Sequence, residues 1–93
     1  MKKYLPLGSI VTLKEAEKKI MIIGRFQMSE DVLYDYSGVL FPEGYLNKDQ
    51  LYVFNNSDIG SLYYMGMQNE EEFTFRKKLA ELDQKNEEAE QEK

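Results

Sequence analysis

The sequence contains no cysteine and no histidine. Without cysteine the chain has no disulfide, no thiolate nucleophile and no cysteine-ligated metal site. Without histidine it also lacks the usual acid–base group at neutral pH and the commonest metal ligand. We therefore expect a protein that is not an enzyme and that uses no cofactor and no metal, because only carboxylates, lysines and hydroxyls remain for catalysis.

A long apolar run is also absent. Two lysines near the N-terminus resemble the start of a signal peptide, but Pro6, Gly8 and Thr12 interrupt the apolar run of roughly 7–15 residues that a signal requires. No stretch approaches the roughly 20 apolar residues of a membrane span. The sequence predicts a cytoplasmic protein without membrane insertion.

The charge of the chain is negative and unevenly placed. Its 93 residues, 42% of them hydrophobic, are enough for one domain with a single core. Of the net charge of −5, residues 1–69 carry −1 and residues 70–93 carry −4. Nucleic-acid binding needs a cationic surface that displaces counterions from phosphates. No nucleic-acid partner is therefore predicted, and a small nucleic-acid-binding barrel is the less favoured alternative.

Short β-branched and aromatic segments, separated by turn residues, predict about five strands in the first two-thirds of the chain. Pro42 and Gly44 mark a turn, and Gly38 inside a strand pattern marks a bulge or a close backbone approach. No helix-length crossover separates the strands, so we predict a mainly β fold with a small SH3-like or barrel-like antiparallel sheet. The predicted strands span 9–13, 20–27, 34–41, 51–54 and 59–66, with a loop over 28–33.

The last third of the chain predicts a helix that begins near Glu70. Asn69 is a good N-cap, and Glu72 completes a capping-box pair with it. Residues 1–82 are predicted to form the single domain, closed by this helix. Residues 83–93 form an acidic polar tail that we expect to be frayed or disordered, because it has too little apolar surface to bury.

Three apolar residues give the predicted helix one narrow stripe. Phe75, Leu79 and Leu82 recur at i, i+4 and i+7. The stripe either docks on the sheet and closes the core or presents an edge to a helical partner, for which two turns are short. Homo-oligomerisation through this helix stays open.

Tyrosines, one phenylalanine and methionines gather between residues 45 and 67. Such side chains are favoured at protein interfaces because they bury a large area while tolerating a wet edge. They also fill cores, and we expect most of them to do so in a domain this small. Tyr63 and Tyr64 cannot both point inward on one strand, so one of them should be exposed. The set is Tyr45, Tyr52, Phe54, Tyr63, Tyr64, Met65 and Met67.

Carboxylates are the remaining catalytic candidates. Glu30, Asp31, Asp35, Asp49 and Asp58 lie in or near predicted turns. A glycosidase-like pair must flank a cleft, and nothing in the sequence places two of them across one. Ordinary surface solubility explains them better.

The order of several motifs resembles a known family. The sequence runs Leu5-Pro6-Leu7-Gly8-Ser9-Ile10-Val11, then Lys19 to Arg25, then Tyr34 to Tyr45, then Phe54-Asn55 and Asp58-Ile59 ahead of Tyr63-Tyr64-Met65-Gly66. Over residues 4 to 80 this order resembles the family called domain of unknown function 4176, from Gram-positive bacteria of the Firmicutes. The resemblance implies a place in type VII secretion loci, beside WXG-like helical proteins and LXG-domain toxins, and implies no active site.

These observations together predict a non-catalytic, protein-binding accessory factor. The leading hypothesis is a chaperone or targeting adaptor for an LXG-type toxin or its WXG-like helical companion, and the alternative is an immunity protein that inhibits a cognate toxin. The predicted partner-binding surface combines the turn at residues 41–45 with residues 63–67. Its residues are Phe41, Tyr45, Tyr63, Tyr64, Met65 and Met67.

Overall fold

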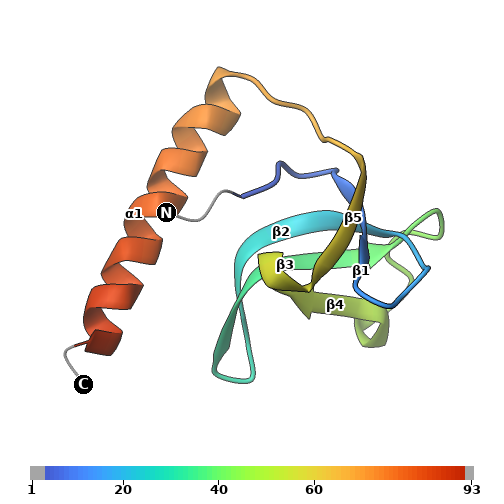
Figure 1. The fold of residues 1–93 in the computed structure, drawn as a ribbon, viewed down its shortest axis with the longest axis horizontal. Helices are drawn as coiled ribbons and strands as arrows, with labels where there is room; N and C mark the ends of the chain where they lie inside the picture. Colours follow the sequence, from blue (N-terminus) through green and yellow to red (C-terminus); the bar gives the residue numbers. More distant parts are fainter. Residues whose placement is uncertain (1–3, 92–93) are drawn as a thin grey trace.

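The computed structural model describes residues 4–91, with side chains described as far as Asn86. The described residues form a five-stranded antiparallel sheet and one long α-helix, α1 (Glu70–Gln91), which confirms the predicted mainly β fold. The strand order is β4-β3-β2-β1-β5, so β4 and β5 form the two edges (Figure 1). The strands are β1 (Ile10–Leu13), β2 (Ile20–Ser29), β3 (Val32–Leu40), β4 (Leu51–Phe54) and β5 (Ile59–Tyr64).

The sheet bends because β2 is irregular. Its register against β3 shifts between Ile22 and Gly24, and Phe26 has a positive φ of 55°. Bulges of this kind increase the twist of a strand and turn it over a core. Gly38 of β3 is the predicted close approach, because a Cβ there would lie 2.9 Å from the carbonyl oxygen of Met21.

The predicted loop over residues 28–33 was wrong. β2 and β3 stay paired as far as Ser29 and Val32, and a two-residue turn joins them. Both turn residues, Glu30 and Asp31, have positive φ, at 49° and 66°. Turns of this type usually contain asparagine or glycine. A glutamate and an aspartate therefore gave no recognisable hairpin signal.

The core is built mainly from residues of the strands, with one contribution from α1. Tyr4 reaches it from the N-terminal segment and Leu79 from the middle of the helix. Ile59 of the edge strand β5 is partly buried and packs against this cluster. The buried hydrophobic residues of the cluster are Tyr4, Val11, Ile20, Ile22, Tyr36, Phe54 and Leu79.

The helix α1 begins at Glu70 as predicted but continues past Leu82 to Gln91. Residues 83–91 are thus helical, where the sequence predicted a frayed tail, and residues 92–93 of that tail lie outside the described residues. Asp83 is buried against the body of the domain. Within residues 4–91 no helix has the length and hydropathy needed to cross a membrane.

Candidate protein-binding surface

The six residues of the predicted partner-binding surface are all exposed, with exposed fractions between 38% for Phe41 and 75% for Met67. Phe41 and Tyr45 lie between β3 and β4, whereas residues 63–67 lie at the end of β5 and in the segment that leads to α1. Phe41 follows the interior strand β3, whereas residues 63–67 belong to or follow the edge strand β5.

Lys19 lies between the two groups. The backbone N–H of Phe41 donates to the carbonyl oxygen of Lys19 over 2.9 Å. The ammonium group of Lys19 lies 4.9 Å from the centre of the Tyr63 ring, which is a cation–π distance. No described contact brings Tyr45 to residues 63–67, so we take the residues on and after β5 as the candidate surface.

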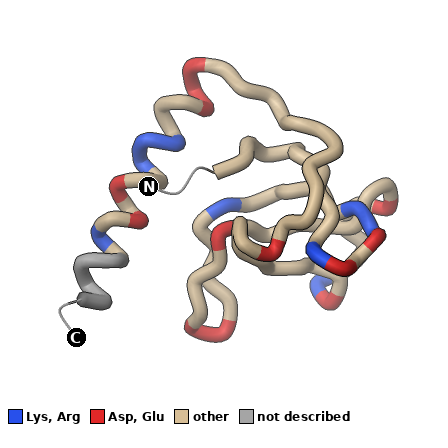
Figure 2. Tube along the Cα trace, in the orientation of Figure 1, with Lys and Arg blue, Asp and Glu red and all other residues tan. Residues whose placement is uncertain are grey.

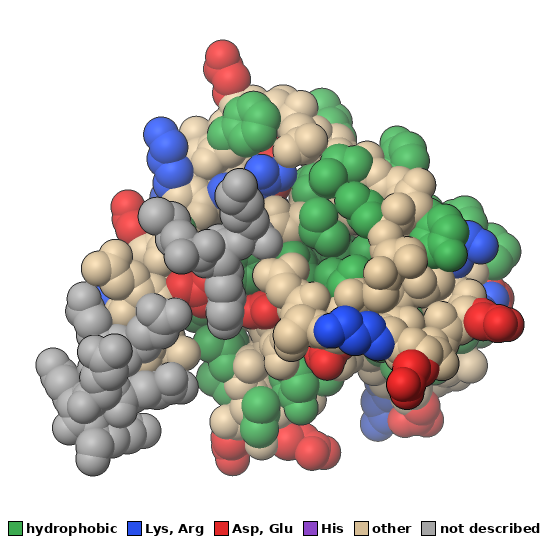
Figure 3. All heavy atoms as spheres, viewed as in Figure 1, with side chains coloured by type: hydrophobic (Ala, Val, Ile, Leu, Met, Phe, Trp, Pro, Cys, Tyr) green, Lys and Arg blue, Asp and Glu red, His purple; other side chains and the backbone are tan. Residues whose placement is uncertain are grey.

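We call this surface the β5 surface, and it includes one residue that the sequence reasoning missed. Leu62 is 45% exposed and continues the row on β5. A signal for it exists in the sequence, because residues 59–69 contain no charged side chain in a chain that is 31% charged. Figure 3 shows apolar side chains gathered over β5 and the segment that follows it. The β5 surface consists of Leu62, Tyr63, Tyr64, Met65 and Met67.

The expectation that most of the clustered aromatic and methionine side chains fill the core was wrong. Phe54 is buried, but both Tyr63 and Tyr64 are exposed. The reason is that β5 is an edge strand whose residues from Gly60 to Tyr64 are exposed at consecutive positions. Successive side chains of a strand point to opposite faces. Neither face of this part of β5 is therefore covered.

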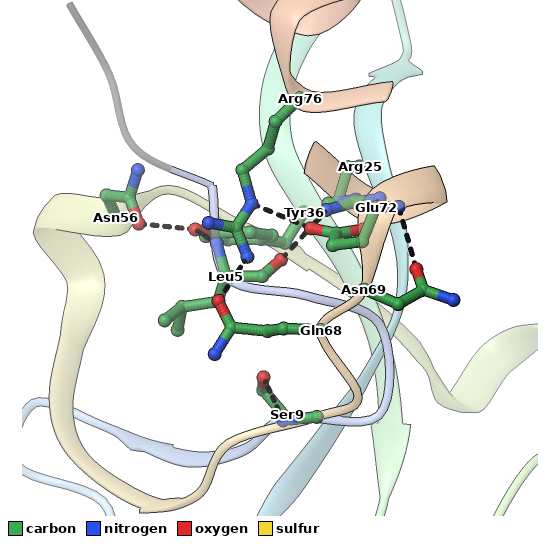
Figure 4. Close-up of polar contacts among 10 residues, drawn as sticks. Leu5, Ser9, Arg25, Tyr36, Asn56, Gln68, Asn69, Glu72 and Arg76 are labelled. Carbon is green, nitrogen blue, oxygen red and sulfur yellow. Dashed lines mark hydrogen bonds and ion pairs between the residues drawn. The ribbon is translucent and has the colours of Figure 1, made fainter. Parts of the chain in front are cut away.

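The backbone behind the β5 surface is held tightly. The N–H of Gly66 donates to the buried hydroxyl of Ser9 over 2.9 Å. A Cβ at position 66 would overlap the carbonyl oxygen of Leu7, so only glycine allows this approach. The segment that carries Met65 and Met67 is thus fixed against the N-terminal segment, as the close-up of Ser9 in Figure 4 illustrates.

A polar clamp holds the start of α1 against β2 (Figure 4). Both guanidinium ends of Arg25 donate to the carboxylate of Glu72, at 2.6 and 2.7 Å. The Nε of Arg76 donates to the same carboxylate over 2.7 Å. Asn69 caps the helix as predicted, because its Oδ1 accepts from the N–H of Glu72 at 3.0 Å. The predicted capping-box role of the Glu72 side chain was wrong, since its carboxylate is bound to the two arginines instead.

The clamp is largely desolvated. The side chain of Arg25 is 3% exposed and that of Glu72 10% exposed. Burial by itself would raise the pKa of Glu72, but the hydrogen bonds and positive charges of Arg25 and Arg76 outweigh it and hold the pKa below its ordinary value. Glu72 therefore stays ionised at neutral pH, and the clamp orients α1 and the segment that leads to it from β5.

A second polar contact fixes the middle of α1. The hydroxyl of Tyr4 donates to the carboxylate of Asp83 over 2.8 Å, and both residues are buried. Burial and the neighbouring Asp83 raise the pKa of Tyr4 far above its ordinary value. The hydroxyl of Tyr36 accepts from the N–H of Leu5 and donates to Oδ1 of Asn56, at 2.8 and 2.6 Å.

The candidate carboxylates serve turns and loops. Glu30 and Asp31 form the β2–β3 turn, and Asp35 accepts from the backbone N–H of Asn56 over 2.8 Å. Asp58 accepts from the N–H of Asn55 over 2.9 Å at the start of the 3-10 turn η2 (Asn56–Asp58). Among the described residues, no three acidic, histidine or cysteine side chains gather as a metal site would require.

Fold and surface together define a small, mainly β domain that is closed by one helix and carries an exposed aromatic edge. A family model described as Domain of unknown function (DUF4176) matches residues 4–75, and the chain belongs to this family. No curated protein and no solved structure matches the chain significantly. The family match ends inside α1, before the residues Leu79 and Asp83 that join the helix to the body.

Proposed function

We propose that this protein is a non-catalytic accessory factor that acts by binding another protein. The observation that carries the proposal is the β5 surface, where consecutive apolar residues are exposed on a rigidly held edge. Exposed apolar patches of this kind on a small domain are typical of protein interaction sites. The aromatic side chains supply large contact area, and the methionines adapt to an irregular partner.

We further propose that the client is an LXG-type toxin or its WXG-like helical companion, and that the protein acts in the cytoplasm as a chaperone or targeting adaptor. The support for this choice of client is the resemblance to the family, which implies a place in type VII secretion loci beside such toxins and helical proteins. The acidic charge of the chain, −5 overall, keeps such a complex soluble. An immunity function remains the competing hypothesis, and it differs in the region of the toxin that is bound.

The test is co-expression of the full chain with the separate N-terminal and C-terminal halves of the LXG protein from the same locus. Size-exclusion chromatography with light scattering then measures the complexes. We expect a stable complex with the N-terminal half. A complex with the toxin half alone would replace the adaptor by an immunity protein, and binding to neither half would refute the proposed client.

Matched variants test whether the client binds to the β5 surface. Met67→Ser and Tyr64→Ser remove exposed residues of the β5 surface and should weaken the client complex about tenfold or more. Met28→Ser is the control, because Met28 is similarly exposed, at 68%, but lies near the tip of the β2–β3 hairpin. Equal effects of all three variants would argue against the β5 surface.

A further inference from the structure

The outer edge of β5 is open. In the sheet order β4-β3-β2-β1-β5, β5 pairs with β1 on one side, and among residues 4–91 no strand pairs with its other side (Figure 1). The other edge strand, β4, has four residues and lies between the 3-10 turns η1 (Lys48–Gln50) and η2. β5 is longer, with six residues, and runs directly into the extended segment before α1.

The sequence of this edge lacks charge and proline, although the register of β5 against β1 is irregular at two points. Natural edge strands are commonly interrupted by proline or carry lysines that discourage another chain. From Ile59 to Asn69 the chain has no charged residue and no proline. Its side chains are exposed on both faces of the strand, so an added strand would find apolar neighbours above and below the sheet.

We propose that β5 is a strand-addition site, where an extended segment of the partner protein pairs with the open edge. Main-chain hydrogen bonds provide the affinity in this mode, and alternate side chains of the added strand provide the specificity. The register against β1 shifts between Leu62 and Tyr64, which pair with the adjacent residues Val11 and Ile10 and therefore lie on opposite faces. An added strand with apolar residues at alternating positions would meet an exposed apolar side chain of β5 on either face. This inference rests on the proposed function and names the binding mode of the same surface.

Charge selects a foreign strand with basic ends over a second copy of this chain. Asp58 directly precedes β5, and Glu70 and Glu71 follow the uncharged stretch. Each copy carries −5, so two copies of the chain repel each other. Lysine or arginine at both ends of the added strand would complement these carboxylates.

The probe is an eight-residue peptide of alternating valine and threonine with arginine at each end. Isotope-edited NMR of the full chain records backbone contacts between the peptide and the protein. We expect cross-strand contacts to residues of β5. A second peptide, in which prolines replace alternate threonines, cannot form a strand ladder and should not bind.

Two variants separate edge pairing from general charge effects. Ser61→Lys places a lysine on the exposed edge and should weaken peptide binding about tenfold or more. Gln84→Lys makes the same charge change at an exposed position of α1 and should leave binding unchanged. Equal binding of the proline peptide, contacts away from β5, no binding, or a dimer that Ser61→Lys dissociates would each overturn the proposal.

The client complex distinguishes the two proposals. If the client half binds equally well to the wild type and to Ser61→Lys, strand addition is wrong while protein binding stands. If no client half binds but the peptide pairs with β5, the proposed client is wrong while the strand-addition site stands.

Discussion

At the scale of single residues, the buried ion pair between Arg25 and Glu72 governs how α1 is attached. Removing one partner of such a pair leaves the other charge buried without compensation. Glu72→Ala should therefore lower the free energy of unfolding by about 3 kcal/mol, measured by urea denaturation. Because the pKa of Glu72 is lowered in the folded state, this contribution is present above its ordinary pKa of 4.5 and is lost as the pH falls below it.

The control for this prediction is the neighbouring residue. Glu71 is exposed on the same helical turn, and Glu71→Ala should change the free energy of unfolding by less than about 0.5 kcal/mol. Equal losses for the two variants would mean that the clamp adds nothing beyond the general charge of the helix N-terminus.

Two buried tyrosines make the domain sensitive to alkali. Burial raises the pKa of both Tyr4 and Tyr36 above the ordinary value of 10. A group with a raised folded pKa contributes stability below its unfolded pKa and loses it as the pH rises above that value. Above pH 10 the free energy of unfolding should fall by up to about 1.4 kcal/mol per pH unit for each of them.

Chemical denaturation between pH 8 and pH 11 tests this dependence. Tyr4→Phe should flatten the alkaline decline, although it loses the hydrogen bond to Asp83 and starts from a lower stability by about 1–3 kcal/mol. Tyr45→Phe changes an exposed tyrosine and should follow the wild type. An unchanged slope in Tyr4→Phe would contradict the role assigned to this hydroxyl.

At the scale of elements, α1 faces the body with a mixed surface rather than with the predicted apolar stripe. Leu79 is 2% exposed, whereas Phe75 and Leu82 are about half exposed. Leu79→Ala should lower the free energy of unfolding by about 2–5 kcal/mol. Leu82→Ala should lower it by less than about 1 kcal/mol, because much of this side chain is already in water. Thermal or urea unfolding of the two variants measures both losses. Equal losses would mean that Leu82 packs against the body as Leu79 does, as the predicted apolar stripe requires.

The start of α1 could be predicted from the sequence, but the contacts that attach α1 to the sheet could not. The start of the helix followed from Asn69, whose capping role depends on adjacent residues. The clamp did not, because Arg25 and Glu72 are far apart in the chain and only the bent sheet brings them together. The strands were predictable from local patterns, but the turn at Glu30 and Asp31 lacked the residues that usually mark it.

The candidate surface was only partly predictable from the sequence. Exposure depends on position in the sheet, and aromatic composition does not reveal which strand is at the edge. The sequence therefore placed residues 63–67 in the candidate surface and at the same time expected most such side chains in the core. The edge position of β5 resolves the conflict in favour of exposure, and the uncharged stretch around it is the signal that marks Leu62.

Figure 2 shows how the charges are distributed over the whole molecule. Acidic and basic side chains alternate along α1, and a mixed cluster occupies the turn between β1 and β2. No residue of the edge strand β5 carries a charge, so its open outer edge is uncharged. The uncharged, open edge therefore supports both proposals for β5, namely partner binding and strand addition.

The whole domain should depend on a part of α1 that lies beyond the family match. A chain that ends at Phe75 contains all matched residues but lacks Leu79, and it leaves the Tyr4 hydroxyl without Asp83. A short helix remnant gains little from its own hydrogen bonds, because helices in proteins depend on tertiary packing. We expect this chain to lose cooperative thermal unfolding. A chain that ends at Asn86 keeps both contacts and should unfold cooperatively, within about 1 kcal/mol of the full chain. Cooperative unfolding of the shorter chain at native stability would show that the sheet folds alone and that α1 serves the partner instead of the core.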